Sequence, residues 1–154
     1  MGLTKSKKIA DGRERSKAVR SLTCGQVMTK PRLLIETASV AEALDKITIN
    51  EWDHLFIINS ERVPIGRVHA VDLLKLIAKK SVNREVAWMH SIPAGQLVTQ
   101  GTMTMREKTP LLKAAALMLS NDINQLAVVD SEGSIVGVVS HSTVARILLS
   151  LIHI

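Results

Sequence analysis

The sequence predicts an α/β (α+β) fold made of two tandem copies of one small unit, each in the order helix, strand, strand, helix. The segment 55–68 aligns without a gap with the segment 126–139, and Gly66 stands 71 residues before Gly137. Helical and strand periodicities alternate in the same order within each copy. Hydrophobic residues make up 46% of the 154-residue chain but aromatic residues only 2%, so the core is expected to consist of aliphatic side chains.

The repeat also predicts how the chain is divided. Residues 25–29 align with 95–99 at an offset of 70, so one residue has been inserted between the two aligned blocks. We expect a basic N-terminal tail or helix over 1–22, a first repeat over 23–80, a connector over 81–94 and a second repeat over 95–154. Neither half buries enough surface alone, so the apolar faces of the two sheets are expected to pack against each other, face to face.

Each copy opens with a predicted helix. In the first copy, Ser39 and Glu42 have the spacing of a capping box, directly before apolar residues at helical spacing. In the second copy, Thr109 takes the N-cap place and Pro110 the first helical position, where its missing N–H costs nothing.

Two short β-rich runs and a second helix complete each copy. The runs cover 55–58 and 63–68 in the first copy, and 126–129 and 135–139 in the second. The second helices carry apolar residues at Val71, Leu74, Ile77 and Ala78, and at Val144, Ile147, Leu148 and Leu151. A sheet of three or slightly more strands with both helices on one face leaves its other face apolar.

Two apolar segments lie outside this pattern. Trp88 and Met89 interrupt a polar connector, and they form either a contact surface or local core. The apolar C-terminal residues 147–154 favour self-association, so a homodimer is expected.

Most of the net positive charge lies in the first twenty residues of the chain. The net charge is +6, and residues 1–20 hold seven basic and two acidic side chains, which leaves the body nearly neutral. Such a tail either binds nucleic acid or an anionic membrane, or it is a solvated, poorly ordered terminus.

The cysteine content and the lengths of the apolar stretches indicate the cellular compartment and whether the chain contacts a membrane. The single cysteine, Cys24, cannot form an internal disulfide and is expected to be a small buried hydrophobic residue. The first twenty residues show no apolar signal region, and the longest apolar stretch, 145–154, is too short to cross a bilayer. We therefore expect a cytoplasmic protein without membrane contact.

Several short motifs, taken in order, resemble those of the cystathionine-β-synthase (CBS) domain. The first three are Val27-Met28-Thr29, the segment 39–44 and an apolar strand that ends in Asn or Asp. The fourth begins with a glycine and two strand residues, continues with Ser or Thr and two residues of any type, and ends with an Asp at the start of a helix. Two such domains in tandem resemble a Bateman module. The resemblance implies a pair of sheets with pseudo-two-fold symmetry and two clefts between the copies that bind AMP, ADP, ATP or S-adenosylmethionine. It also implies a regulatory module that relays ligand binding to a partner protein.

The resemblance assigns roles to particular residues. It implies that Asp72 accepts hydrogen bonds from a ribose diol, with His69 where Ser or Thr is usual. The second copy keeps Ser140 but has Thr143 in place of the aspartate, so one principal site is expected. The further ligand-binding candidates are Thr29, Lys30, Pro31, Leu33 and Leu34 around the adenine, His54 near phosphate, and Ile57, Arg67, His141 and Arg146.

Motifs of catalysis are not found in the sequence. It contains no phosphate-binding P-loop, no dinucleotide fingerprint and no nucleophile elbow, and its five histidines form no metal pattern. We expect neither an enzyme nor a metal site, and no required cofactor. The alternative function is a dimerisation platform with degenerate clefts, in which residues 1–20 bind nucleic acid.

Overall fold

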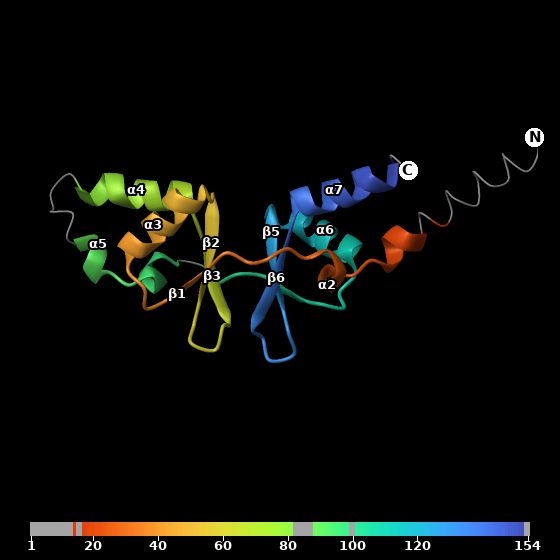
Figure 1. Ribbon diagram of the computed structural model, residues 1–154, viewed down its shortest axis with the longest axis horizontal. Helices are drawn as coiled ribbons and strands as arrows, with labels where there is room; N and C mark the ends of the chain where they lie inside the picture. The colour runs from red at the N-terminus through yellow and green to blue at the C-terminus, as the bar shows by residue number, and fades with distance from the viewer. Residues whose placement is uncertain (1–13, 15–16, 82–87, 99–100, 153–154) are drawn as a thin grey trace, which may run out of the picture. The chain divides into compact units, whose positions relative to one another are not determined.

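The computed structural model describes residues 14, 17–81, 88–98 and 101–152, and these form two three-stranded sheets with their helices (Figure 1). This confirms the predicted mixed α/β class with two tandem units. The first elements in chain order are α2 (Cys24–Val27), β1 (Leu33–Ile35), α3 (Val40–Asn50), β2 (His54–Ile58), β3 (Pro64–His69) and α4 (Ala70–Ser81). The others are α5 (Trp88–Ser91), the 3₁₀ helix η1 (Ala94–Leu97), β4 (Thr104–Arg106), α6 (Leu111–Ser120), β5 (Gln125–Val129), β6 (Ile135–Ser140) and α7 (His141–Ile152).

The first sheet has the strand order β1-β2-β3. Strand β1 pairs parallel with β2, so that Leu34 lies opposite Ile57, and β2 pairs antiparallel with β3, so that His54 lies opposite His69. Each sheet therefore has one strand, β1 or β4, that the sequence analysis did not locate. Each of these strands has only three residues, which is too short to show an alternating pattern.

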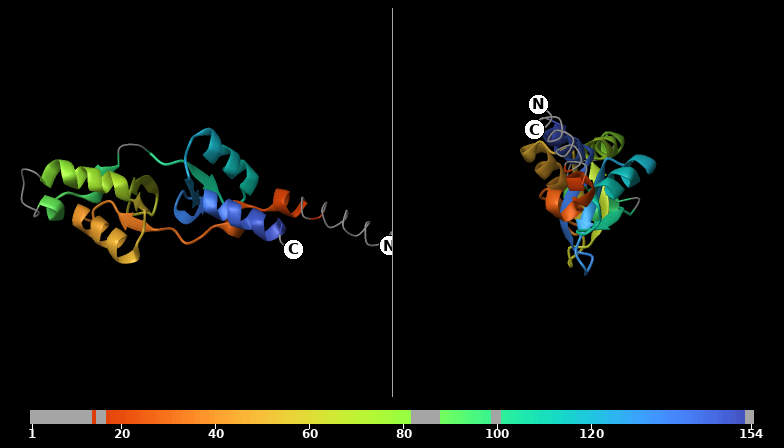
Figure 2. Two further views of the ribbon diagram at one scale, coloured as in Figure 1. Left: turned by 90° about the horizontal axis from the view of Figure 1, so that it is seen from above. Right: turned by 90° about the vertical axis from the view of Figure 1, so that its right-hand side faces the viewer.

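One face of the first sheet carries the core of its unit. Leu55 and Ile57 of β2 pack with Val68 of β3 and Leu73 of α4 in one buried cluster. Helices α3 and α4 lie against this face (Figures 1 and 2). Because successive strand residues point to opposite faces, His54 and Phe56 belong to the other face, and both are also buried.

The second sheet repeats this plan with the order β4-β5-β6. Its helices α6 and α7 contact each other (Figure 1). Leu111, Ala114 and Met118 are the buried residues of α6, and their spacing of three and four residues places them on one face of the helix.

The chain forms two compact units whose boundaries differ from those of the sequence repeats. One unit contains the described parts of residues 1–29, 104–128 and 137–154, and the other contains those of 30–103 and 129–136. The residues up to Thr29, including α2, thus group with most of the second repeat, whereas η1, which opens the second repeat, groups with the first. The predicted boundaries at 23–80 and 95–154 describe the duplication in the sequence, whereas these units describe packing.

The leading segment of each repeat is the part before its first strand, which contains α2 in the first repeat and η1 in the second. Matching backbone hydrogen bonds hold the leading segments in both units. In one unit, the N–H groups of Cys24 and Gly25 donate to the carbonyl oxygens of Thr109 and Glu107, and the N–H of Leu111 donates to Leu22. In the other, Ala94 and Gly95 donate to Ala38 and Glu36, and Val40 donates to Ile92. The duplication therefore extends to individual hydrogen bonds.

The two predicted helix caps have different outcomes. The Ser39 hydroxyl accepts a hydrogen bond from the Glu42 N–H at 3.1 Å, which confirms the first cap. The second prediction is wrong by one residue, because α6 begins at Leu111 and its cap is Pro110, without a side-chain bond. The Thr109 carbonyl and the Leu111 N–H bond to the leading segment instead, and these bonds fix the start of α6.

The apolar residues outside the repeat pattern are partly placed by the structure. Met89 of α5 packs against the first core cluster, which favours local core for this residue, while the Trp88 side chain lies outside the described residues. On α7, Leu148 and Leu149 are 40% and 53% exposed. No helix in the described ranges is both long enough and apolar enough to span a bilayer.

Candidate functional site

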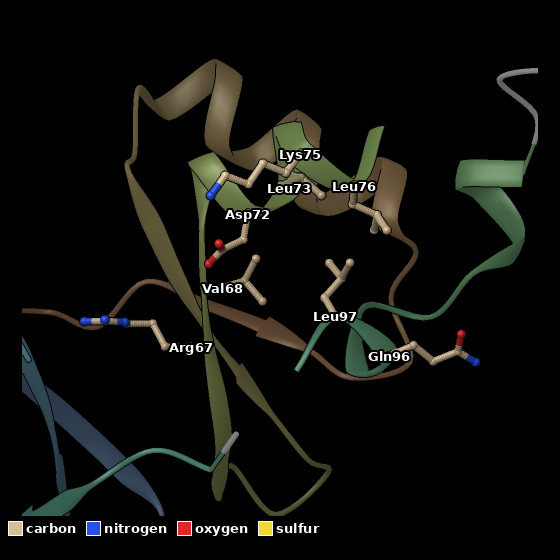
Figure 3. A pocket seen from close by; sticks show the side chains of 8 residues that line it. All are labelled: Arg67, Val68, Asp72, Leu73, Lys75, Leu76, Gln96 and Leu97. Atoms are coloured by element: carbon tan, nitrogen blue, oxygen red, sulfur yellow. The ribbon is translucent and has the colours of Figure 1, made fainter. Parts of the chain in front are cut away.

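A pocket of about 370 Å³ opens beside the start of α4, and Figure 3 shows its lining side chains. Three elements of one compact unit form it: the end of β3, the first turns of α4, and η1. Pockets of this size are suitable for small molecules. The lining residues are Arg67, Val68, Asp72, Leu73, Lys75, Leu76, Gln96 and Leu97.

Asp72 places a carboxylate in this pocket. It lies in the first turn of α4, which begins directly after β3, and its side chain points from the helix toward β3 (Figure 3). Among the described residues, no hydrogen bond or ion pair to this carboxylate is found. At the same helix start, the N–H of Val71 donates a hydrogen bond to Nδ1 of His69 at 3.3 Å, so His69 serves as the side-chain cap of this helix.

The apolar lining comes from both sides of the pocket. Val68 and Leu73 are almost fully buried, and Leu76 and Leu97 are half-buried. Their aliphatic surface can cover the face of a flat, weakly polar group, and Asp72 adjoins it with two acceptor oxygens. This arrangement can hold an apolar ring joined to a group that carries hydroxyls.

The corresponding helix start in the second repeat has a different chemistry. Thr143 is 3% exposed, and its Oγ1 lies 3.0 Å from Oγ of Ser140. The two residues also bond reciprocally, because the Ser140 hydroxyl accepts from the Thr143 N–H and the Thr143 hydroxyl accepts from the Ser140 N–H. The polar side chains at this position therefore cap α7.

Met28 occupies the sheet surface nearby in the same unit. Its side chain lies so close to Gly137 that a β-carbon at this glycine would collide with it. The next residue, Thr29, pairs with Val138 of β6 through backbone hydrogen bonds in both directions at 3.0 Å. Thr29 is thus fixed on β6 and does not line the pocket that holds Asp72.

His54 belongs to a cluster on the other face of the first sheet. Its Nδ1 is in short contact with the Asp53 carboxylate, and its ring is edge-on to Phe56. Burial lowers the pKa of His54, and the hydrogen bond with His54 lowers the pKa of Asp53. A carboxylate can only accept, so Nδ1 carries the hydrogen of the neutral ring. His54 is therefore mostly uncharged at neutral pH.

An arginine covers the exposed side of this cluster. The Arg32 guanidinium lies 3.4 Å from the Asp53 carboxylate and 5.5 Å from the centre of the Trp52 ring. These contacts hold Arg32 against its own sheet.

Of the predicted site residues, two line the pocket: Asp72 and Arg67. Leu34 and Ile57 belong to the buried core, and Lys30, His141 and Arg146 are exposed. None of the other predicted residues is in the pocket lining; these are Thr29, Lys30, Pro31, Leu33, Leu34, His54, Ile57, His69, Ser140, His141, Thr143 and Arg146. Their roles toward a ligand stay predictions.

Sequence reasoning missed several lining residues. Lys75 and Leu76 follow Asp72 by about one helical turn, so helical spacing alone could have placed them beside it. Gln96 and Leu97 could not be found in this way, because they reach the pocket only through the packing of η1 on the first repeat.

The described part of the chain can be searched for a metal site and for a nucleophilic cysteine. No group of three or more His, Cys, Asp or Glu side chains there is suitable for holding a metal ion. Cys24 is fully buried, and burial raises the pKa of its thiol, so the thiolate needed of a nucleophile is disfavoured.

The chain matches known proteins in both sequence and fold. The CBS domain pattern matches residues 24–79 and again 94–150. The chain is 31% identical over 113 residues to homoserine O-acetyltransferase of Methanohalobium evestigatum, which covers 73% of this chain and 21% of that protein. It is 27% identical over 153 residues to the chloroplastic CBS domain-containing protein CBSX1 of Arabidopsis thaliana, covering 84% of this chain and 65% of that protein.

A solved structure shows the same architecture. The crystal structure of CBSX2 of Arabidopsis thaliana in complex with AMP superposes with a TM-score of 0.70 at 26% identity, covering 84% of this chain and 98% of that one. The chain spans about a fifth of the length of the acetyltransferase and about two thirds of that of CBSX1. The two matched segments together make up most of the chain, which belongs to the CBS domain family and carries two CBS domains in tandem, as in a Bateman module.

Proposed function

We propose that this chain is a non-catalytic regulatory module that binds an adenosine-containing ligand in the pocket beside α4. The observation that carries the proposal is the Asp72 carboxylate, which adjoins an apolar lining in a pocket of about 370 Å³. A carboxylate can accept hydrogen bonds from both hydroxyls of a ribose. The aliphatic side chains would cover the purine. CBSX2, which is 26% identical, was crystallised with AMP, and this supports an adenine nucleotide as ligand.

Calorimetric titration tests the proposal. We expect at least one of AMP, ADP, ATP and S-adenosylmethionine to bind with a dissociation constant below the millimolar range. No binding of any of the four at millimolar concentration would contradict it.

The variant Asp72→Asn tests the site itself. It removes the charge but keeps the shape, and hydrogen bonds to charged groups contribute about 1.5–3 kcal/mol, so affinity should fall about tenfold or more. Asp45→Asn is the matched control, because Asp45 is an exposed carboxylate of α3 outside the pocket lining. Equal affinities for the two variants would place the ligand elsewhere.

The regulatory part of the proposal concerns helix α4. One face of this helix contributes Asp72, Leu73 and Leu76 to the pocket, whereas Val71 and Leu74 are 48% and 59% exposed. Exposed apolar side chains on the helix that holds the ligand residue are suited to a second copy of the chain or to a regulated partner protein. We expect the ligand to change the affinity of that contact, which sedimentation velocity with and without AMP can measure.

The basic N-terminus supports a second candidate function. Residues 1–20 carry five of the six net positive charges of the chain. Binding of RNA or DNA that weakens with salt and is lost on deletion of residues 1–20 would favour the nucleic-acid platform. Unchanged binding after the deletion would exclude this role for the tail.

A further inference from the structure

The pocket has an apolar end and a charged end. Figure 3 shows Leu76 and Leu97 toward one end, with the Asp72 carboxylate and the ammonium of Lys75 toward the other. Lys75 follows Asp72 by three residues on α4, so the two side chains share one helix face. A nucleoside monophosphate with its base at the apolar end and its ribose at Asp72 would direct its phosphate toward Lys75.

Lys75 is better placed for this role than the other cation of the pocket. In Figure 3 the guanidinium of Arg67 points away from the pocket, and Arg67 has interactions of its own. For Lys75 no hydrogen bond or ion pair with another described residue is found. Its flexible stem and compact charge suit a phosphate group that needs a point charge.

We infer that Lys75 is a specificity-determining residue that makes the pocket prefer a nucleoside monophosphate over the corresponding uncharged nucleoside. This inference rests on the proposed function, since it assigns the phosphate end of the same site. The second repeat keeps a basic residue at the equivalent position, Arg146, but not the carboxylate. In the second repeat the place of Asp72 is taken by Thr143, so Arg146 has no equivalent carboxylate three residues before it.

The experiment compares AMP with adenosine by calorimetry in the full chain, at one fixed salt concentration. The unaltered chain should bind AMP more tightly than adenosine. Lys75→Gln should weaken AMP by about threefold to tenfold, as expected for one partly exposed charge pair, and should change adenosine by less than about twofold. Lys113→Gln removes the same charge at an exposed lysine of α6 outside the pocket lining and should leave both affinities unchanged.

The outcomes separate this inference from the proposed function. If Lys75→Gln weakens both ligands equally or neither, or if Lys113→Gln weakens AMP as much, the assignment of Lys75 is wrong while the site at Asp72 stands. If the unaltered chain binds neither AMP nor adenosine, this inference is overturned, and the proposed function is overturned with it only if ADP, ATP and S-adenosylmethionine also fail to bind.

Discussion

At the scale of single residues, the two repeats differ in chemistry at the start of their second helices, α4 and α7. Asp72 and Thr143 occupy equivalent places in the first turns of α4 and α7. The aspartate is exposed and lines a pocket, whereas the threonine is buried and closes a hydrogen-bonded cap with Ser140. The same backbone position is thus a candidate ligand contact in one copy and a structural contact in the other.

His54 makes the stability of the fold dependent on pH. Its pKa in the folded chain is lowered, chiefly by burial, below the ordinary value of 6.5. Well above pH 6.5 the ring is neutral in both the folded and the unfolded chain, so the contribution of His54 to stability does not change with pH there. Below this pH the unfolded chain takes up the proton more readily, so the free energy of unfolding should fall with acidification. Urea denaturation between pH 5 and pH 8 measures this decrease.

The variant His54→Gln should show a smaller decrease over this range, because the group that titrates is gone. His141→Gln is the control, since His141 is exposed, and it should keep the decrease of the unaltered chain. If the pH dependence of His54→Gln equals that of the unaltered chain, His54 is not its source.

At the scale of elements, the hairpins β2–β3 and β5–β6 have the same type of turn, but different residues form it. Asn59 and Asp130 each accept two backbone hydrogen bonds through a side-chain oxygen. Three residues later, Arg62 and Gly133 adopt φ values of 63° and 86°. Glycine enters this left-handed region without cost, whereas other residues pay about 1–2 kcal/mol.

Exchanging the residue types at this turn should change stability in opposite directions. Gly133→Ala should lower the free energy of unfolding by about 1 kcal/mol, since no atom lies near its side-chain position and only the backbone is affected. Arg62→Gly should raise it by a few tenths to about 1 kcal/mol. Thermal or urea denaturation of both variants checks the signs. A neutral Gly133→Ala would show that the turn relaxes.

At the scale of the whole molecule, the compact units and not the sequence repeats should be the folding units. Ala94 is fully buried in the core of the first repeat, and three backbone hydrogen bonds tie its segment to the start of α3. Each such bond contributes about 1 kcal/mol, which matters to a unit whose total stability is only a few kcal/mol.

A fragment of residues 30–103 should therefore be more folded than a fragment of residues 23–80, which lacks this segment. Circular dichroism and urea denaturation of the two fragments would measure the difference. Equal stability of the two fragments would contradict the role given to the leading segment.

The duplication, the main helices and strands and the carboxylate of the first repeat were predictable because each depends on local spacing or on a matching pattern. The lining by Gln96 and Leu97 was not, because these residues reach the pocket only through the packing of η1 on the first repeat. The cap formed by Ser140 and Thr143 was likewise hidden, because either residue could bind a ligand or its own helix. Sequence patterns indicate which groups are present, and packing decides which of them remain available.

We expect the first repeat alone to hold a ligand, because only it keeps the aspartate at the start of its second helix. The most direct test is the stoichiometry of AMP binding, measured calorimetrically on the full chain at known active concentration. We expect one AMP per chain in the unaltered protein and weakening by about tenfold or more in Asp72→Asn. Two AMP molecules per chain, or undiminished binding by Asp72→Asn, would contradict it.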